Sequence, residues 1–304
     1  MKKPSRFQIT KDDQVLIEML WRWKLLTTTQ VHLAVYKERT IEKCYRRLMD
    51  LYRQKYIECF TTQDQKASFW QLTEKGYNVL DFSELEMDHS GFRSENQEHD
   101  FWVNAIHFGA WINQKTLNAA IFTEQQIRRT SVESFPKWVP HTKEHTPDGW
   151  LNINLNQPNK TSLIALEVEL SKKARVNYDK VGKFYSEIVD VANVLWFVRK
   201  IRDAQYIQRH LHSGQQNKIS EHSFVLMDHF IKNQYQAKII FGKNLDQPIS
   251  HILNIMNSDA GLATTQHRLL DIRKYPVNSS KLKIPDSVDL GVKRYIRNEI
   301  EVLS

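Results

Sequence analysis

Three acidic side chains near the middle of the chain have the spacing of a metal site. Asp148 precedes a predicted strand at residues 150–155, and Glu167 and Glu169 lie in the next one, at 163–170. Side chains two apart share a strand face, about 7 Å from each other along the backbone. If the two strands are neighbours, Asp148 stands beside both glutamates. Converging carboxylates raise one another's pKa unless a cation joins them.

Oxygen ligands of this kind suit Mg²⁺ or Mn²⁺, which could bind a scissile phosphate and activate a water molecule. The alternative is that these acids are ordinary solvated strand ends, since single Asp-Gly and Glu-x-Glu pairs are common. The segment 163–170 is otherwise apolar and predicts a buried strand, where acids are rare unless they have a partner. The pattern therefore favours the metal site.

The elements before this site predict three helices and a hairpin. Thr10 caps a helix that runs to about Lys24, and threonines at 27–29 and 40 cap two more. Strand-like runs at 57–60 and 68–72 follow, joined by the polar segment 61–67, and a further helix starts at Thr73. Helical spacing gives the first helix an apolar stripe of Val15, Leu16, Met19, Leu20 and Trp23. This order predicts a winged helix-turn-helix domain over residues 8–82.

The third predicted helix is basic enough to contact DNA. Residues 37–55 contain seven lysines and arginines against three acids. In a recognition helix, such side chains meet phosphates or guanine edges. The alternative is a solvated basic face that contacts other proteins. The expected DNA contacts are Arg39, Lys43, Arg46, Arg47 and Arg53.

The rest of the chain predicts an α/β domain with a central mixed sheet. Residues 83–98 are polar and predict a linker. Strands are expected at 119–122, 150–155, 163–170, 193–198, 223–227 and 237–241, with helices from 101 and at 175–189 and 203–211. Helices and strands that alternate in this way favour one sheet covered by helices. The domain is expected over 99–245, followed by a C-terminal extension over 246–304 whose structure the pattern does not define.

The composition of the chain argues against several classes of protein. The net charge of +8 favours partners that carry phosphate, and two cysteines are too few for a disulfide scaffold. Nine glycines and no glycine-rich phosphate loop argue against an NTPase. The N-terminus lacks the apolar stretch of a secretory signal, and no apolar run approaches the roughly 20 residues that span a bilayer. We expect a cytoplasmic protein without membrane insertion.

Two stretches resemble known families. The phrase Phe-Trp-Gln-Leu-Thr-Glu-Lys-Gly at 69–76 resembles the end of the wing in winged-helix DNA-binding domains. The residues Thr-Pro-Asp-Gly at 146–149 and Leu-Ile-Ala-Leu-Glu-Val-Glu-Leu-Ser-Lys-Lys at 163–173 resemble PD-(D/E)XK nucleases, whose fold is restriction-endonuclease-like. Together they resemble replication-relaxation proteins, related to MobC-type plasmid relaxases, over roughly residues 10–200.

The resemblance implies roles for named residues. Asp148 matches the motif's aspartate, Glu167 its second acid, and Glu124 the upstream acid, so these three would bind the metal. Glu169 stands where the family has a lysine that positions the attacking water. The missing charge could come from Lys172 or Lys173 after the strand, or from Lys180 or Lys183 on the following helix. Without such a lysine, the protein would bind metal or DNA without cutting.

Two tyrosines and two histidines are further candidates. Tyr178 and Tyr185 lie seven residues apart, on one face of the predicted helix. Either could be the nucleophile of a relaxase, but core packing is the commoner role for such a pair. His99 and His145 could contact phosphate or support the acids, though each is more often a plain polar residue.

These observations predict a Mg²⁺- or Mn²⁺-dependent DNA endonuclease that nicks double-stranded DNA at a plasmid or mobile-element origin of transfer or replication. Relaxosome or coupling proteins would be its partners, and a homodimer is an open alternative because winged helices often pair. The rival prediction is a non-catalytic DNA-binding regulator or relaxosome accessory protein. Its DNA binding would survive loss of Asp148 and depend on Arg46 and Arg47.

Overall fold

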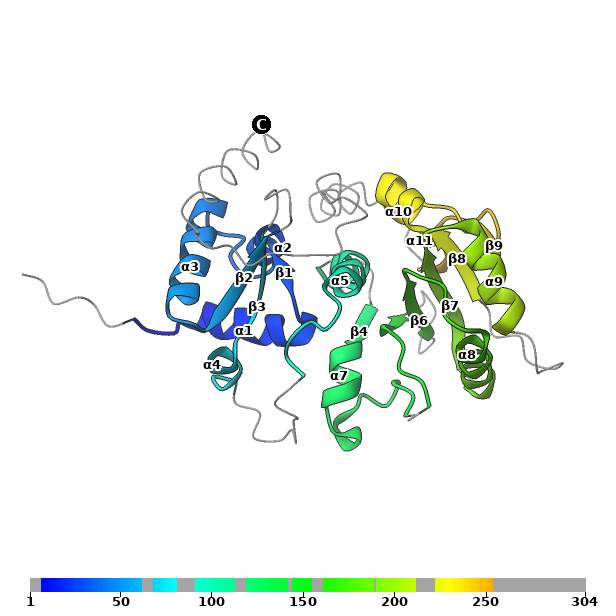
Figure 1. Cartoon of the computed structure of the whole chain (residues 1–304), viewed down its shortest axis with the longest axis horizontal. Helices are drawn as coiled ribbons and strands as arrows, with labels where there is room; N and C mark the ends of the chain where they lie inside the picture. Colours follow the sequence, from blue (N-terminus) through cyan, green and yellow to red (C-terminus); the bar gives the residue numbers. More distant parts are fainter. Residues whose placement is uncertain are drawn as a thin grey trace, which may run out of the picture. The chain divides into compact units, whose positions relative to one another are not determined.

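The computed structural model describes residues 7–61, 68–80, 91–112, 119–141, 144–154, 161–188, 190–211 and 222–253. They form two compact units, one up to Phe101 and one from Trp102 onward. Both units mix helices and strands, as the sequence predicts (Figure 1). Within the ranges given above, every helix is too short or too polar to cross a lipid bilayer.

In the first unit, the described residues up to Tyr77 form a small antiparallel sheet and four helices. Its elements are α1 (Lys11–Trp23), β1 (Leu26–Thr27), α2 (Thr28–Ala34), α3 (Ile41–Arg53), β2 (Ile57–Thr61), β3 (Ser68–Leu72) and α4 (Glu74–Tyr77). The sheet order is β1-β3-β2. The hairpin of β2 and β3 confirms the prediction, although its connection at 62–67 lies outside the described residues. The sequence does not predict the two-residue strand β1, which pairs with β3, because so short a segment has no alternation.

Threonine caps set where these helices begin. The side chains of Thr10, Thr27, Thr40 and Thr73 each accept a hydrogen bond from a backbone N–H in the first turn. All four caps agree with the sequence. The predicted stripe of α1 is wrong at Val15, which is 47% exposed, whereas Ile17 is buried. The buried face of α1 also includes the charged residue Asp13, which the spacing of apolar residues cannot predict.

The second unit is built on a six-stranded mixed sheet. Its strands are β4 (Ala119–Thr123), β5 (Gly149–Asn154), β6 (Thr161–Glu169), β7 (Val191–Val198), β8 (His222–Leu226) and β9 (Phe241–Gly242), in that spatial order. Strands β4, β5 and β6 are antiparallel neighbours, β6, β7 and β8 are parallel, and β9 is antiparallel to β8. The predicted central mixed sheet is therefore confirmed.

Helices connect and cover these strands. They are α5 (Gln97–Ile112), which begins in the first unit, α7 (Glu124–Arg129), α8 (Arg175–Glu187), α9 (Ile201–Leu211), α10 (Met227–Asn233) and α11 (Ile249–Ile252). Short 3₁₀ turns lie at Val132–Ser134 and Gln234–Gln236. The helices α8 and α9 are the crossovers that parallel neighbours require.

One face of the sheet packs against α8 and α9, which lie side by side (Figure 1). Trp150, Ala165 and Trp196 face these helices in a common core with Tyr185 and Ile207. The two helices approach closely at Gly182. A Cβ atom there would lie 2.3 Å from the backbone oxygen of Leu211, so no larger residue fits without movement.

One predicted strand is corrected, and several predicted segments lie outside the described residues. The strand predicted at 237–241 is wrong, since only Phe241–Gly242 form a strand there. Ala237 and Ile239 are buried, as expected for alternate residues of a strand. Their backbone groups, however, do not pair with a neighbouring strand: the carbonyl oxygen of Ala237 accepts from the N–H of Ile249, and the N–H of Ile239 donates to the carbonyl oxygen of Gln247. Residues 83–90 of the predicted linker, Leu155, Val189 and residues 254–304 of the predicted extension lie outside the described residues.

Candidate functional site

The structure brings Asp148, Glu167 and Glu169 to one end of two neighbouring strands. Strands β5 and β6 are antiparallel with Gly149 opposite Leu166, so Asp148 at the start of β5 meets the end of β6. One oxygen of Asp148, Oδ2, accepts a hydrogen bond of 2.6 Å from the backbone N–H of Val168. The three acids are only 8%, 7% and 6% exposed. They are therefore buried strand-end acids, unlike the solvated ones of the alternative interpretation.

Glu167 is held by two side chains that bind the same oxygen. The Tyr185 hydroxyl donates to Glu167 Oε1 at 2.5 Å, and His145 Nε2 lies 2.6 Å from that atom. Burial by itself lowers the pKa of His145, but the charge and hydrogen bond of Glu167, together with the charge of Asp148, outweigh burial, so the pKa is raised. Burial raises the pKa of Tyr185 well above its usual value. His145 thus supports the acids, one of the two roles considered for it.

Glu169 is paired with a lysine from the loop that follows its strand. Lys173 Nζ lies 3.1 Å from Glu169 Oε2, although the Lys173 side chain is 57% exposed. Burial raises the pKa of Glu169 in spite of this lysine. Burial lowers the pKa of Lys173, but the charge and hydrogen bond of Glu169, together with the charges of Glu167 and Asp148, outweigh burial, so the pKa is raised. The backbone N–H of Lys173 donates to the Tyr178 hydroxyl at 2.8 Å, which fixes the start of the loop.

The other lysines proposed for this site have different surroundings. Lys172 Nζ lies 4.5 Å above the ring of Tyr206. Lys180 is exposed on α8, and Lys183 pairs with Glu187 at 3.7 Å. Of the four lysines, Lys173 is the one whose contact with an acid of the site is seen.

The remaining sequence candidates lie around the acids in different ways. The backbone N–H of Glu124 bonds the carbonyl oxygen of Asp148 at 3.2 Å, but the Glu124 carboxylate pairs with Arg128 at 2.7 Å. Tyr178 and Tyr185 share one face of α8, as predicted, and both are buried, which agrees with core packing. His99 lies in the first unit, 3.6 Å from Asp100. Among the described residues, no three His, Cys, Asp or Glu side chains are arranged to hold a metal ion.

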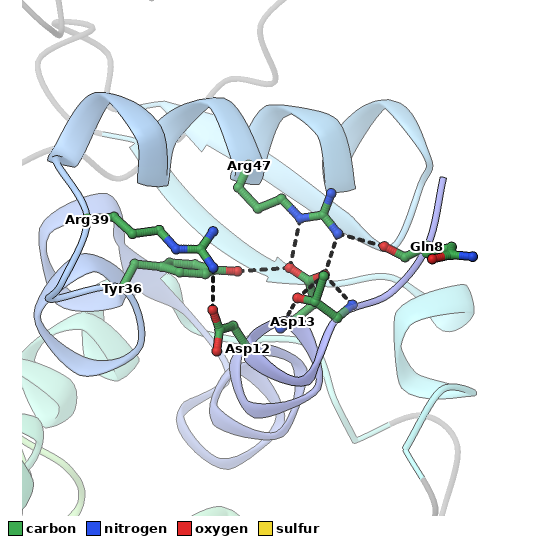
Figure 2. Close-up of polar contacts among 7 residues, drawn as sticks. Gln8, Asp12, Asp13, Tyr36, Arg39 and Arg47 are labelled. Atoms are coloured by element: carbon green, nitrogen blue, oxygen red, sulfur yellow. Dashed lines mark hydrogen bonds and ion pairs between the residues drawn. The ribbon is translucent and has the colours of Figure 1, made fainter. Parts of the chain in front are cut away.

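In the first unit, Arg47 of α3 is bound inside the fold. Its Nε atom donates to Asp13 Oδ1 at 2.9 Å, and its second amino group bonds both Asp13 Oδ2 and the carbonyl oxygen of Gln8 (Figure 2). The Tyr36 hydroxyl also donates to Asp13 Oδ1, at 2.9 Å. Burial raises the pKa of Asp13, but these bonds, led by that of Arg47, outweigh it and lower the pKa.

The other predicted DNA contacts divide into two groups. Arg39 pairs with Asp12 at 2.5 Å and stacks on Tyr36 (Figure 2), and Arg53 pairs with Asp50 at 3.2 Å. Lys43 and Arg46 are exposed on α3. The count of charges in α3 does not reveal the pairing of Arg39, because its acidic partner Asp12 lies in α1.

Comparisons of the chain with protein families, curated proteins and solved structures found no match. The family resemblance drawn from the sequence motifs thus stays an expectation.

Proposed function

We propose that this chain binds double-stranded DNA through its first unit and cleaves a phosphodiester bond with its second, using Mg²⁺ or Mn²⁺. The observation that carries the proposal is the buried group of Asp148, Glu167 and Glu169 on two adjacent strands, with Lys173 at 3.1 Å from Glu169. Buried carboxylates cost free energy unless they are paired or bind a cation. Their placement at a strand end with a raised Glu169 pKa is typical of a functional site.

The element order supports the fold expected for each task. Two helices, a third basic helix and a hairpin, with the short strand β1 added beside β3, fit a winged helix. In the second unit, the two acidic strands are neighbours in a mixed sheet, as a restriction-endonuclease-like domain would require. The proposed substrate is the origin DNA of a plasmid or mobile element, and relaxosome proteins are the proposed partners.

The acids present fit a hard divalent cation. Asp148 and Glu167 would hold it, because Mg²⁺ commonly takes one or two carboxylates and completes its shell with water and substrate phosphate. Both bonds to Glu167 use Oε1, and the bond from Val168 uses Asp148 Oδ2. When bound, the ion would polarise the phosphate and lower the pKa of a water molecule.

The chain's own residues supply the rest of the site. Tyr185 and His145 fix the Glu167 carboxylate, and the backbone N–H of Val168 fixes Asp148. Lys173 brings a positive charge to the strand end where the superfamily motif would have a lysine in place of Glu169. This charge can attract the phosphate and stabilise the negative charge that develops on it.

The test is cleavage of supercoiled origin plasmid by the full chain with Mn²⁺ or Mg²⁺. We expect a nicked product, and a rate lower by about 100-fold or more in Asp148→Ala and Glu167→Gln. Lys173→Gln should also slow cleavage, whereas Lys180→Gln, on exposed α8 surface, serves as the matched control. Intact plasmid under all these conditions, with a folded protein that still binds DNA, would exclude the nuclease.

A second candidate function has its own support. Glu167 Oε1 already has two partners, and the described residues hold no three-side-chain metal group. These observations favour a DNA-binding regulator or relaxosome accessory protein that keeps the second unit as a scaffold. Such a protein would bind DNA with strong salt dependence, and Asp148→Ala would leave that binding unchanged.

A further inference from the structure

The loops after β6 and β7, with the first turns of α8 and α9, form a basic edge next to the acidic site. The two strands are parallel, with Glu169 paired to Val198, so the segments that follow them leave the sheet at the same end. The following segments, 171–178 and 199–202, contain six lysines and arginines and no acid. We define the basic edge by its exposed members, which are Lys172, Lys173, Arg175, Lys200 and Arg202.

Contacts within the unit hold part of this edge in place. Lys172 lies over the ring of Tyr206, which belongs to α9 and so ties the first loop to the second helix. Lys173 reaches Glu169, and Arg175 pairs with Asp179 at 3.3 Å. Lys200 and Arg202 are exposed on either side of Ile201, which is itself 51% exposed. The segment after β7 therefore exposes Lys200 and Arg202 to solvent, whereas Lys173 in the segment after β6 contacts Glu169.

We propose that the basic edge binds the sugar-phosphate backbone of duplex DNA beside the acidic site. This proposal rests on the proposed function and adds to it the surface that holds the substrate on the second unit. Lysine and arginine contacts to phosphate position a protein on DNA without reading its sequence. Such contacts also offset the repulsion between phosphates and three buried acids. The basic edge thus binds any sequence, and sequence preference comes from the first unit.

The first experiment measures the affinity of the full chain for a short duplex of arbitrary sequence, with EDTA present so that no cleavage occurs. The variant Lys200→Gln/Arg202→Gln should bind at least about tenfold more weakly. Its salt slope, meaning the slope of the logarithm of the binding constant against the logarithm of the salt concentration, should be smaller in magnitude by about two. The control Arg209→Gln/Lys243→Gln removes the same charge. Arg209 lies in the last turn of α9, and the backbone N–H of Lys243 bonds His222 at the start of β8, so both lie at the opposite edge of the sheet.

A second measurement reports directly on the surface. Amine acetylation followed by mass spectrometry should show that the duplex protects Lys172 and Lys200 but leaves Lys243 reactive. Equal reactivity with and without DNA, or equal loss of affinity in both double variants, overturns the proposal. Protection by polyglutamate as strong as that by DNA overturns it too, because the edge would then serve an acidic protein.

The two proposals fail in different ways. If the duplex protects the basic edge but no plasmid is cut, the edge stands and the nuclease is rejected. If plasmid is cut and the Lys200→Gln/Arg202→Gln variant binds and cuts like its control, the nuclease stands and the edge is rejected.

Discussion

Among single residues, Asp13 joins two helices of the first unit through its hydrogen bonds. Its carboxylate is fully buried and bonds Thr10, Tyr36 and Arg47. Because Thr10 is the N-cap of α1 and Arg47 belongs to α3, one side chain links the start of the first helix to the helix proposed to contact DNA. Arg47 consequently acts within the fold, although its sequence context predicts a DNA contact.

Removal of Arg47 should destabilise the first unit. In Arg47→Met, Asp13 stays buried without its main cationic partner, so we expect a loss of about 3 kcal/mol in the free energy of unfolding. Chemical denaturation followed by circular dichroism measures this loss. The control is Arg39→Met, which breaks an exposed ion pair and should cost about 1 kcal/mol or less. Equal losses in both variants would show that burial of Asp13 does not matter.

The lowered pKa of Asp13 predicts a dependence of stability on acid. Unfolding returns the pKa of this carboxyl toward its ordinary value of 3.8, while in the folded protein the pKa lies lower. Its contribution is therefore complete above pH 3.8 and is lost as the pH falls through the folded pKa. We expect the stability difference between the parent and Asp13→Asn to shrink in that acidic range. Parallel pH profiles for the two proteins would contradict this result.

Among the elements, α8 connects the core of the second unit to its acidic site. It carries Tyr185, which bonds Glu167, and Gly182, which allows α9 to approach. A change between these helices should therefore affect both stability and the position of the hydroxyl.

We expect Gly182→Val to destabilise the second unit by about 2 kcal/mol, because the added atoms meet backbone instead of a flexible side chain. Thermal unfolding measures the effect. The control is Lys180→Val, which places the same β-branched residue at an exposed position of α8. A Gly182→Val protein as stable as this control would show that α8 and α9 can separate without cost.

A separate prediction concerns α3. We expect Lys43→Gln/Arg46→Gln to weaken binding to duplex DNA by at least about tenfold and to leave the melting temperature unchanged, since both side chains are exposed. Fluorescence anisotropy and thermal unfolding test the two halves of this expectation. The control, Arg39→Gln/Arg53→Gln, removes the same charge from ion-paired positions. Unchanged affinity in the Lys43→Gln/Arg46→Gln protein would remove α3 from the DNA interface.

Sequence patterns predict those elements whose signals are local. Threonine caps, the hairpin of β2 and β3 and the apolar strands β6 and β7 follow from neighbouring residues. The prediction of a strand at 237–241 is wrong because a pattern of buried residues does not determine which backbone groups form hydrogen bonds with each other. The sequence motif predicts that Asp148 lies beside β6. The contacts of Lys173 with Glu169 and of Tyr185 with Glu167 depend instead on how α8 packs against the sheet, which local sequence patterns do not specify.

For the whole molecule, exposed basic side chains of the described residues form at least two surfaces, one on α3 and one on the basic edge. These surfaces belong to different compact units and share no residue. Effects of changes at sites that act independently add. The salt dependence of DNA binding should therefore be the sum of two separate contributions.

We expect a protein that combines Lys43→Gln/Arg46→Gln with Lys200→Gln/Arg202→Gln to lose about four from its salt slope, twice the loss of either pair. Affinity measured across a series of salt concentrations gives these slopes. A combined loss no greater than that of one pair would mean that a single surface binds DNA at a time.

The Asp13–Arg47 contact has a consequence for natural variation among homologues of this chain. An acid and a base that satisfy each other in the interior are under joint constraint, so positions 13 and 47 should change together, as a swap or as an apolar pair. Lys43 and Arg46, which face solvent on the same helix, carry no such constraint. Substitutions at positions 43 and 46 should therefore occur independently of each other, whereas those at positions 13 and 47 should occur together.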